Sequence, residues 1–235
     1  MDKIERKQMI QKAFDTVADG YDHPSLAFFP DTAERMLDLL SMDVSNHLLA
    51  VCTGNGMVAL KAAQKLSSGQ VTGIDLSPGM LQQAQAKADK LNLNNTQFIN
   101  MDLEDLRSGD TLYDVATCSF GLFFIDDMIA ALKNISSSVK QGGSIAISSF
   151  TGDAFNPFSQ MFLDCYESFG KEIPTLSWKR LESEANIRSV FNAAGLNEIS
   201  FYPYPLCYER ENAPPCWDVV RNDGKRDPLY YRTDG

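Results

Sequence analysis

The stretch "LLAVCTGNGMVAL", residues 48–60, decides how this chain is expected to fold. An apolar run typical of a strand stops at a loop with two glycines, and a helical pattern follows at once. Glycines permit a sharp turn and let a ligand approach the backbone, and a helix start offers unpaired N–H groups. The stretch therefore predicts a strand, a ligand-binding loop and a helix N-terminus in succession.

Strand patterns and helix patterns alternate through the middle of the chain. Such alternation predicts βαβ units, a parallel sheet and right-handed crossovers. We therefore expect an α/β fold, a Rossmann-like doubly wound and mostly parallel sheet. The expected strands cover residues 47–52, 70–75, 96–102, 112–120 and 142–150, and the helices between them cover 57–66, 78–91 and 127–139.

The segments on either side of this core are mostly helical in pattern. A first helix is expected over residues 3–19 and a second over 31–40, where Asp31 and Thr32 can cap it. After the core, helical patterns cover residues 156–169 and 178–194. The last expected strand begins at residue 196, and its two prolines favour a place at a sheet edge.

Composition argues against several classes of protein. The 235 residues are 44% hydrophobic with a formal net charge of -10, which disfavours a nucleic-acid partner because phosphate binding needs clustered Lys and Arg. The sequence contains no run of about 18 apolar residues, so we expect no membrane span. The N-terminus is charged and amphipathic, unlike a secretory signal. Five cysteines without a Cys-x-x-Cys pair and two histidines give no metal-site spacing. Reduced thiols in a cytoplasmic protein are the simplest interpretation.

Three loops carry polar groups to the carboxyl ends of expected strands, where open α/β sheets bind ligands. The first is the loop 53–56, with its two glycines. The second is Asp75, whose carboxylate can accept hydrogen bonds from both ribose hydroxyls. The third is Asp102, which can accept from an exocyclic amine while the Leu103 N–H donates to a ring nitrogen. Together they predict a ligand that contains a nucleoside.

Alternative interpretations exist for each of these signals. The glycines can form a bare turn, and Asp75 and Asp102 can each cap a helix. The pattern Gly54-x-Gly56-x-x-Ala59, with Asp75 about 20 residues on, also satisfies the dinucleotide fingerprint, so an NAD-dependent oxidoreductase is a competing hypothesis. An acid after the third strand and the long segment before the first strand favour a different nucleoside cofactor.

The chain resembles the class I S-adenosylmethionine-dependent methyltransferases, and more narrowly the ubiquinone and menaquinone biosynthesis C-methyltransferases. The resemblance covers about residues 10–200. It rests on "AFDTVADGYD", "VCTGNG", "TGIDLSPGML", "NMDLEDL", "YDVATCSFGLFFIDD" and "VKQGGSIAISSF", in family order. It implies S-adenosylmethionine as the cofactor and methyl transfer to a small, apolar or aromatic acceptor.

The resemblance also implies which residues bind the cofactor. Its methionine end would lie between Tyr21 and the loop of Thr53, Gly54, Asn55 and Gly56. Asp75 would hold the ribose, and Leu76 and Met80 would pack on the adenine face. The adenine edge would meet Met101, Asp102 and Leu103, and the transferable methyl would lie near Ser119 and Phe120.

One departure from the family pattern is Ala50, where the family usually has an acid that helps to organise the methionine ammonium. A non-catalytic S-adenosylmethionine-binding module is therefore a third hypothesis. His23 is the only base candidate near the site and is more readily an ordinary polar loop residue, so no catalytic residue is assigned.

We expect a single domain with three parts: an N-terminal helical cap (1–45), a cofactor-binding core (46–150) and an acceptor-side region (151–235). The cap and the acceptor-side region would roof the acceptor. The family usually closes its sheet with an antiparallel strand pair, for which few residues remain after Tyr208. A homodimer is one arrangement that would complete it.

Overall fold

A computed structural model describes residues 2–107, 109, 112–173 and 176–205 of the chain. Its centre is a single sheet of five parallel strands in the order β3-β2-β1-β4-β5. The strand order reverses between β1 and β4, which makes the carboxyl end of β1 the switch point where such sheets bind ligands. The strands are β1 His47–Val51, β2 Gln70–Asp75, β3 Thr96–Asn100, β4 Tyr113–Ser119 and β5 Val139–Ser148.

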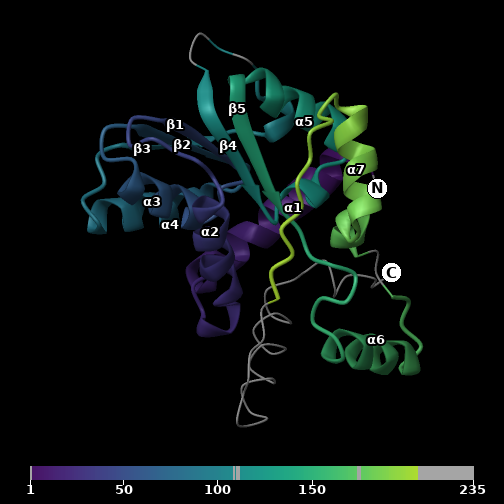
Figure 1. Cartoon of the computed structure of the whole chain (residues 1–235). Helices are drawn as coiled ribbons and strands as arrows, with labels where there is room; N and C mark the ends of the chain where they lie inside the picture. Colours follow the sequence, from purple (N-terminus) through teal and green to yellow (C-terminus); the bar gives the residue numbers. More distant parts are fainter. Residues whose placement is uncertain (1, 108, 110–111, 174–175, 206–235) are drawn as a thin grey trace.

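Helices cover both faces of the sheet, as Figure 1 shows, with α2, α3 and α4 on one face and α5 and α7 on the other. This arrangement confirms the predicted Rossmann-like fold, in which helices connect parallel strands. The helices are α1 Lys3–Val17, α2 Phe28–Asp38, α3 Met57–Lys65, α4 Pro78–Lys90, α5 Met128–Ser137, α6 Phe158–Ser168 and α7 Glu184–Ala193.

Strand β1 shows why this sheet needs cover on both sides. Leu48 and Ala50 belong to the apolar cluster formed with α2 and α3, whereas Leu49 and Val51 belong to the cluster formed with α5 and α7. All four side chains are buried. An apolar run without alternation is typical of a parallel strand that is buried on both faces.

The N-terminal boundary of α2 differs from the prediction. The helix begins at Phe28, and Ala27 precedes it without a side-chain cap, so the predicted capping by Asp31 and Thr32 is wrong. Pro30 lies in the first turn instead of before the helix. A proline is tolerated there because the first-turn N–H groups have no partner within the helix.

The region after β5 also differs from the prediction. The helix expected over 178–194 is divided into a 3-10 turn, η5 Ser177–Leu181, and α7, because Ser183 caps α7 by accepting from the Asn186 N–H. Residues 196–205 form no strand, since Pro203 and Pro205 remove two ladder donors. The rest of that expected strand lies outside the described residues.

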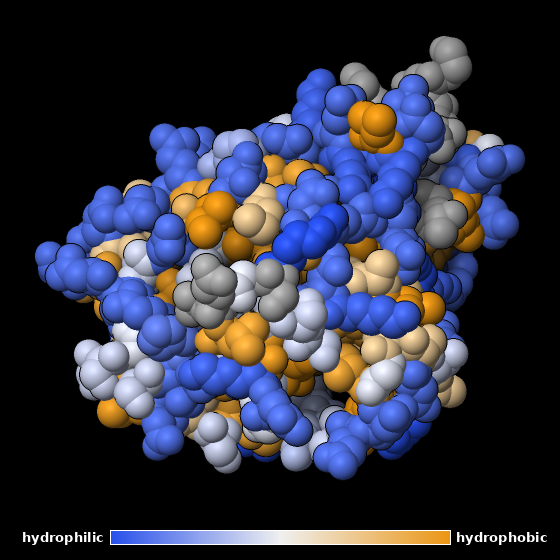
Figure 2. Space-filling view, turned by 90° about the horizontal axis from the view of Figure 1, so that it is seen from above, coloured by the Kyte–Doolittle hydropathy of each residue, from blue (hydrophilic) through white to orange (hydrophobic). Residues whose placement is uncertain are grey.

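Helix α6 stands apart from the sheet in Figure 1, and none of its residues is buried. Figure 2, a view from above Figure 1, shows hydrophilic residues over most of that face, with separate apolar groups between them. Among the described residues, no helix combines the length and apolarity that a membrane crossing requires.

Candidate functional site

The loop after β1 contains two glycines in left-handed backbone conformations. Gly54 has a φ of 54° and Gly56 a φ of 86°. A Cβ at Gly56 would lie 2.9 Å from the Ala84 Cβ, so this glycine lets α3 and α4 approach each other closely. A Cβ at Gly54 would have no neighbour within 4 Å, so the backbone there borders open space.

Asp75, at the end of β2, faces the same loop. One carboxylate oxygen accepts from the Gly54 N–H at 2.8 Å and the other from the Ser77 N–H at 2.9 Å. Burial raises the pKa of Asp75, while these N–H groups act to lower it. The cap of α4 is the Ser77 hydroxyl, which accepts from the Met80 N–H at 3.1 Å. Asp75 is therefore not the helix cap, and its remaining lone pairs are available to a ligand.

Asp102, at the end of β3, has two partners within the chain. One oxygen accepts from the Glu104 N–H at 2.9 Å and caps the 3-10 turn η3 Leu103–Asp105, as the capping alternative predicted. The other oxygen pairs with the Lys7 ammonium at 2.5 Å. Lys7 also pairs with the Glu104 carboxylate, and Lys3 pairs with it at 2.8 Å. Burial acts to raise the pKa of Glu104, but the two ammonium groups hold it below its ordinary value.

Helix α1 covers the carboxyl ends of the strands, whereas the sequence predicted that the N-terminal helical cap would roof the acceptor. Its basic side chains reach the acids at the carboxyl edge of the sheet, and Arg6 pairs with Asp126 beyond β4. Asp15 accepts from the Ser77 hydroxyl at 2.5 Å and from the Gly79 N–H at 2.9 Å. The amphipathic pattern predicts this helix, but a pattern within one helix carries no sign of the surface it covers.

The loop after α1 is tied to the glycine loop by Asp22. This carboxylate accepts from the Asn55 side-chain amide at 2.9 Å and from the Lys87 ammonium at 2.7 Å. Asn55 is buried, although its amide serves this tie. Asp22 therefore fixes the loop that carries Tyr21 beside the glycine loop.

A cavity of about 130 Å³, called the smaller cavity below, lies between α1 and the carboxyl ends of the strands. Every residue predicted to bind the cofactor lines it except Gly56, whose role is the packing of α3 on α4. The predicted residues that line it are Tyr21, Thr53, Gly54, Asn55, Asp75, Leu76, Met80, Met101, Asp102, Leu103, Ser119 and Phe120. The lining residues that the sequence did not single out include Arg6, Lys7, Ile10, Gln11, Phe14 and Thr117.

Two hydroxyls in this lining have unused hydrogen-bonding capacity. The Oγ1 atoms of Thr53 and Thr117 are buried and have no hydrogen-bond partner among the described residues. Buried polar atoms are normally paired, so such atoms in a cavity wall are available to a polar ligand.

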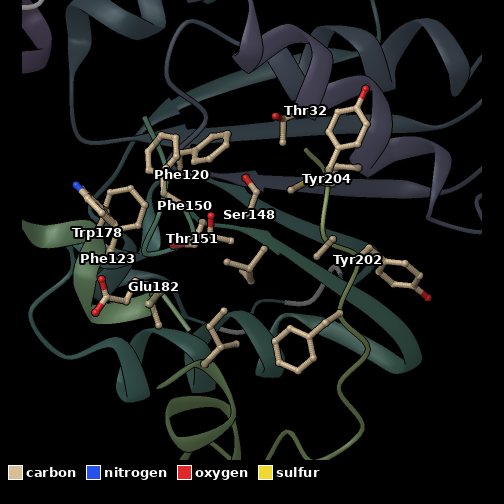
Figure 3. A pocket seen from close by; sticks show the side chains of 18 of the residues that line it. Thr32, Phe120, Phe123, Ser148, Phe150, Thr151, Trp178, Glu182, Tyr202 and Tyr204 are labelled. Atoms are coloured by element: carbon tan, nitrogen blue, oxygen red, sulfur yellow. The ribbon is translucent and has the colours of Figure 1, made fainter. Parts of the chain in front are cut away.

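A second space, called the larger cavity below, has a volume of about 2120 Å³. It runs from a group of aromatic rings in contact with one another, along β5, to residues 195–205 (Figure 3). This aromatic wall consists of Phe28, Phe29, Phe120, Phe123, Phe124 and Phe150, with ring centroids 4.2 to 6.2 Å apart in contacting pairs. Three of these rings, Phe29, Phe120 and Phe124, also line the smaller cavity, so the wall separates the two spaces.

The segment between β4 and α5, called the post-β4 loop below, carries part of that wall. Arg180 of η5 holds its backbone by donating to the carbonyls of Phe123, Ile125 and Asp126 at 3.0, 2.6 and 2.8 Å. Burial, with the nearby Arg6, lowers the pKa of Arg180. The sequence offered no signal for this contact, because Arg180 lies more than 50 residues from its partners.

The charged acid-base groups that line the smaller cavity are carboxylates and cations, not histidines: Asp75, Asp102, Glu104, Asp126, Arg6 and Lys7. No histidine of the described ranges lines either space, so His23, the one base candidate from the sequence, is not part of either lining. In the part of the chain that the structure describes, no three His, Cys, Asp or Glu side chains gather as a metal site would require.

Comparison with known proteins places this geometry among methyltransferases. A methyltransferase domain family matches residues 48–143. Aklanonic acid methyltransferase DauC of Streptomyces sp. (strain C5) is 30% identical over 158 residues, which cover 67% of this chain and 70% of that protein. A demethylmenaquinone methyltransferase of Listeria monocytogenes (serotype 4a, strain HCC23) is 22% identical over 214 residues, covering 83% of this chain and 90% of the relative.

Solved structures show the same fold. A SAM-dependent methyltransferase from Aquifex aeolicus superposes with a TM-score of 0.61 at 19% identity, over 77% of this chain and 87% of that one. Magnesium protoporphyrin IX methyltransferase from Synechocystis PCC 6803, with bound SAH, gives 0.61 at 17% identity, over 81% of this chain and 89% of that one. The NAD-dependent hypothesis finds no support in these similarities.

Proposed function

The chain belongs to the class I S-adenosylmethionine-dependent methyltransferases, and we propose that its acceptor is a flat, largely apolar molecule bound against the aromatic wall. The chain transfers a methyl group from S-adenosylmethionine to a small acceptor. The proposal rests mainly on Phe29, Phe120 and Phe124, which line both cavities. The methyl group and the acceptor must come into contact, so the acceptor has to bind where the two cavities adjoin.

The smaller cavity fits the adenosyl cofactor in its chemistry. Asp75 offers a positioned carboxylate for the two ribose hydroxyls, as the family resemblance implied. Leu76 and Met80 supply apolar surface for the adenine ring, and Met101, Asp102 and Leu103 border its edge. Thr53 and Thr117 bring the two unpaired hydroxyls to the same cavity.

The volume of the smaller cavity implies a movement. It measures about 130 Å³, whereas ligand pockets usually span roughly 300 to 1,000 Å³. Lys7 also pairs with one oxygen of Asp102, the carboxylate that the adenine amine would meet. We therefore propose that α1 moves away from the sheet edge as the cofactor enters, and that Lys7 releases Asp102.

When bound, the cofactor supplies an electrophilic methyl group on a sulfonium. The task of the chain is to align the acceptor with that methyl and to keep water out. Such positioning alone contributes roughly 7 to 11 kcal/mol at best. The aromatic rings of the wall suit this task because they desolvate the acceptor and favour stacking with another flat ring system.

The relatives support a flat acceptor. They are named for aklanonic acid, demethylmenaquinone and magnesium protoporphyrin IX, and the last two names denote a quinone and a porphyrin, which are flat conjugated ring systems. Only the aromatic end of the larger cavity adjoins the smaller one, so we place the acceptor there and not along β5.

Turnover with a panel of ring systems tests the proposal. The purified chain, S-adenosylmethionine and a hydroxynaphthalene, a hydroxyanthraquinone or a small aliphatic acid are mixed, and S-adenosylhomocysteine is measured by mass spectrometry. We expect product with at least one ring system and none with the aliphatic acid. Product with the aliphatic acid alone would contradict a flat acceptor. Binding of S-adenosylhomocysteine without turnover of any acceptor would favour the non-catalytic module.

A further inference from the structure

Two serine hydroxyls connect the smaller and the larger cavity. Ser119 ends β4 and Ser148 ends β5, and the two residues are paired in the sheet register. Their Oγ atoms lie 3.0 Å apart, at hydrogen-bond distance. Ser119 lines the smaller cavity and Ser148 the larger one. The pair therefore joins the two spaces beside the aromatic wall.

The backbone fixes the position of this pair. The Phe120 N–H donates to the Ser148 carbonyl at 3.2 Å, which continues the β4-β5 ladder to the end of both strands. The rings of Phe120 and Phe150 stack at 4.5 Å next to it. In Figure 3 the Ser148 hydroxyl projects into the cavity between these two rings and Thr32. A flat ligand against the wall would therefore bring its polar edge to Ser148.

Proton counting shows what the pair can offer. Two hydroxyls carry two protons, and their mutual hydrogen bond uses one of them. The second proton can be donated to a ligand. An anionic oxygen is the acceptor that gains most from such a donor, because hydrogen bonds to charged groups are about twice as strong as neutral ones.

We propose that Ser148 donates a hydrogen bond to an anionic oxygen of the acceptor, and that the acceptor class is a flat ring system bearing an enolate, a phenolate or a carboxylate. This inference rests on the proposed function. The acceptor atom bonds to the methyl carbon as the carbon–sulfur bond breaks, and the electron pair of that bond stays on sulfur. An anionic acceptor and a cationic donor thus give two uncharged reacting centres, and no proton has to be removed.

A neutral enol, phenol or carboxylic acid would instead have to lose a proton to a base. Among the residues labelled in Figure 3, Glu182 is the one carboxylate, and it lies at the Trp178 end and points away from Ser148. The anionic acceptor is therefore the class that suits the groups around the hydroxyl pair.

Binding of two matched probes tests the inference. 1-Hydroxy-2-naphthoate has the flat shape and the anionic oxygen, and 2-methylnaphthalene has the shape alone. Both are titrated by fluorescence into the protein saturated with S-adenosylhomocysteine. We expect the wild-type chain to prefer the naphthoate, and Ser148→Ala to weaken naphthoate binding about tenfold or more. Binding of 2-methylnaphthalene should change less than about twofold, since no hydrogen bond is involved.

Two further variants separate the hydroxyl from other effects. Ser148→Thr keeps a hydroxyl and should retain most of the naphthoate affinity. Ser137→Ala is the matched control, because the Ser137 hydroxyl lies at the end of α5, donates to the Asn134 carbonyl at 2.9 Å and lines neither cavity. It should leave both affinities unchanged.

Several results would overturn the inference. They are equal wild-type affinity for the two probes, no naphthoate binding at millimolar concentration, or equal losses in Ser148→Ala and Ser137→Ala. Calorimetry with S-adenosylhomocysteine on the same proteins keeps the two proposals distinct. If the wild-type chain does not bind this ligand, the proposed function fails. If it binds the ligand and Ser148→Ala behaves like wild type towards the naphthoate, only the role of Ser148 fails.

Discussion

The two sides of this molecule are built differently. On the cofactor side, residues 47–126, the strands together with α3 and α4 contribute most of the buried residues. On the acceptor side, residues 149–205, the buried residues of the described part are Leu181 and Phe191 alone. The cofactor is a fixed chemical structure and the acceptor varies within the family. The difference teaches that a densely packed region around the proposed cofactor site coexists with a loosely packed region on the acceptor side.

On the cofactor side, the largest loss of affinity is expected from Asp75→Ala. We expect the dissociation constant for S-adenosylhomocysteine to rise about 100-fold, because two hydrogen bonds to a charged acceptor are lost. Isothermal calorimetry measures it. Asp114→Ala is the matched control. Asp114 also accepts a hydrogen bond from a backbone N–H, that of His47, but it lies at the amino end of β4, at the edge of the sheet opposite to Asp75. Equal losses in the two variants would refute the ribose assignment of Asp75.

The second largest effect concerns the glycine loop. Gly56→Ala should lower the free energy of unfolding by about 2 to 3 kcal/mol, because the residue is left-handed and its Cβ would meet Ala84. Gly54→Ala should lower the free energy of unfolding by only about 1 kcal/mol, because Gly54 is also left-handed but an added Cβ would have no neighbour within 4 Å. Urea denaturation compares them. A larger loss at Gly54 would contradict the packing role of Gly56.

A smaller effect is expected where α1 meets the sheet. Lys7→Met removes the ion pairs with Asp102 and Glu104, which we expect to stabilise the docked helix by about 1 kcal/mol. Amide hydrogen exchange in α1 should become roughly fivefold faster. Lys12→Met on the exposed side of the same helix is the control and should leave the exchange rate unchanged.

The same contact predicts a pH dependence. The folded-state pKa of Glu104 is lowered, so its contribution is complete above its unfolded value and is lost as the pH falls through the folded value. Docking of α1 should therefore weaken in acid, below about pH 4.5. If the protection factors of the α1 amides stay the same above and below that pH, the ion pairs do not hold the helix.

The smallest effect belongs to the acceptor side. Met161→Ser on α6 should change the free energy of unfolding by no more than about 0.5 kcal/mol, because Met161 is 66% exposed. The reference is Leu132→Ala on the fully buried face of α5, for which about 2 to 5 kcal/mol is expected. A thermal melt that shows a comparable loss in both variants would mean that α6 is packed as tightly as α5.

The contrast also explains what the sequence predicted. The strands and the glycine loop follow local rules of periodicity and turn chemistry, so residues 47–148 were predicted within a few positions. The contact of Lys7 with Asp102 spans 95 residues and depends on how α1 docks, for which a helical pattern carries no signal. The strand predicted from residue 196 failed within the described residues, because two prolines outweighed its aromatic alternation.

The clamp of Arg180 on the post-β4 loop has a thermodynamic consequence. Phe120 and Phe124 of this loop line both cavities. A ligand in one cavity that fixes the conformation of these rings would therefore change the affinity of the other cavity for its ligand. Linkage requires the coupling to be reciprocal, with each ligand changing the affinity of the other by the same factor. Titrating S-adenosylhomocysteine with and without 1-hydroxy-2-naphthoate measures that factor, and a value of one would mean that the two sites are independent. Through this coupling, a bound acceptor would slow the escape of the methyl donor until transfer is complete.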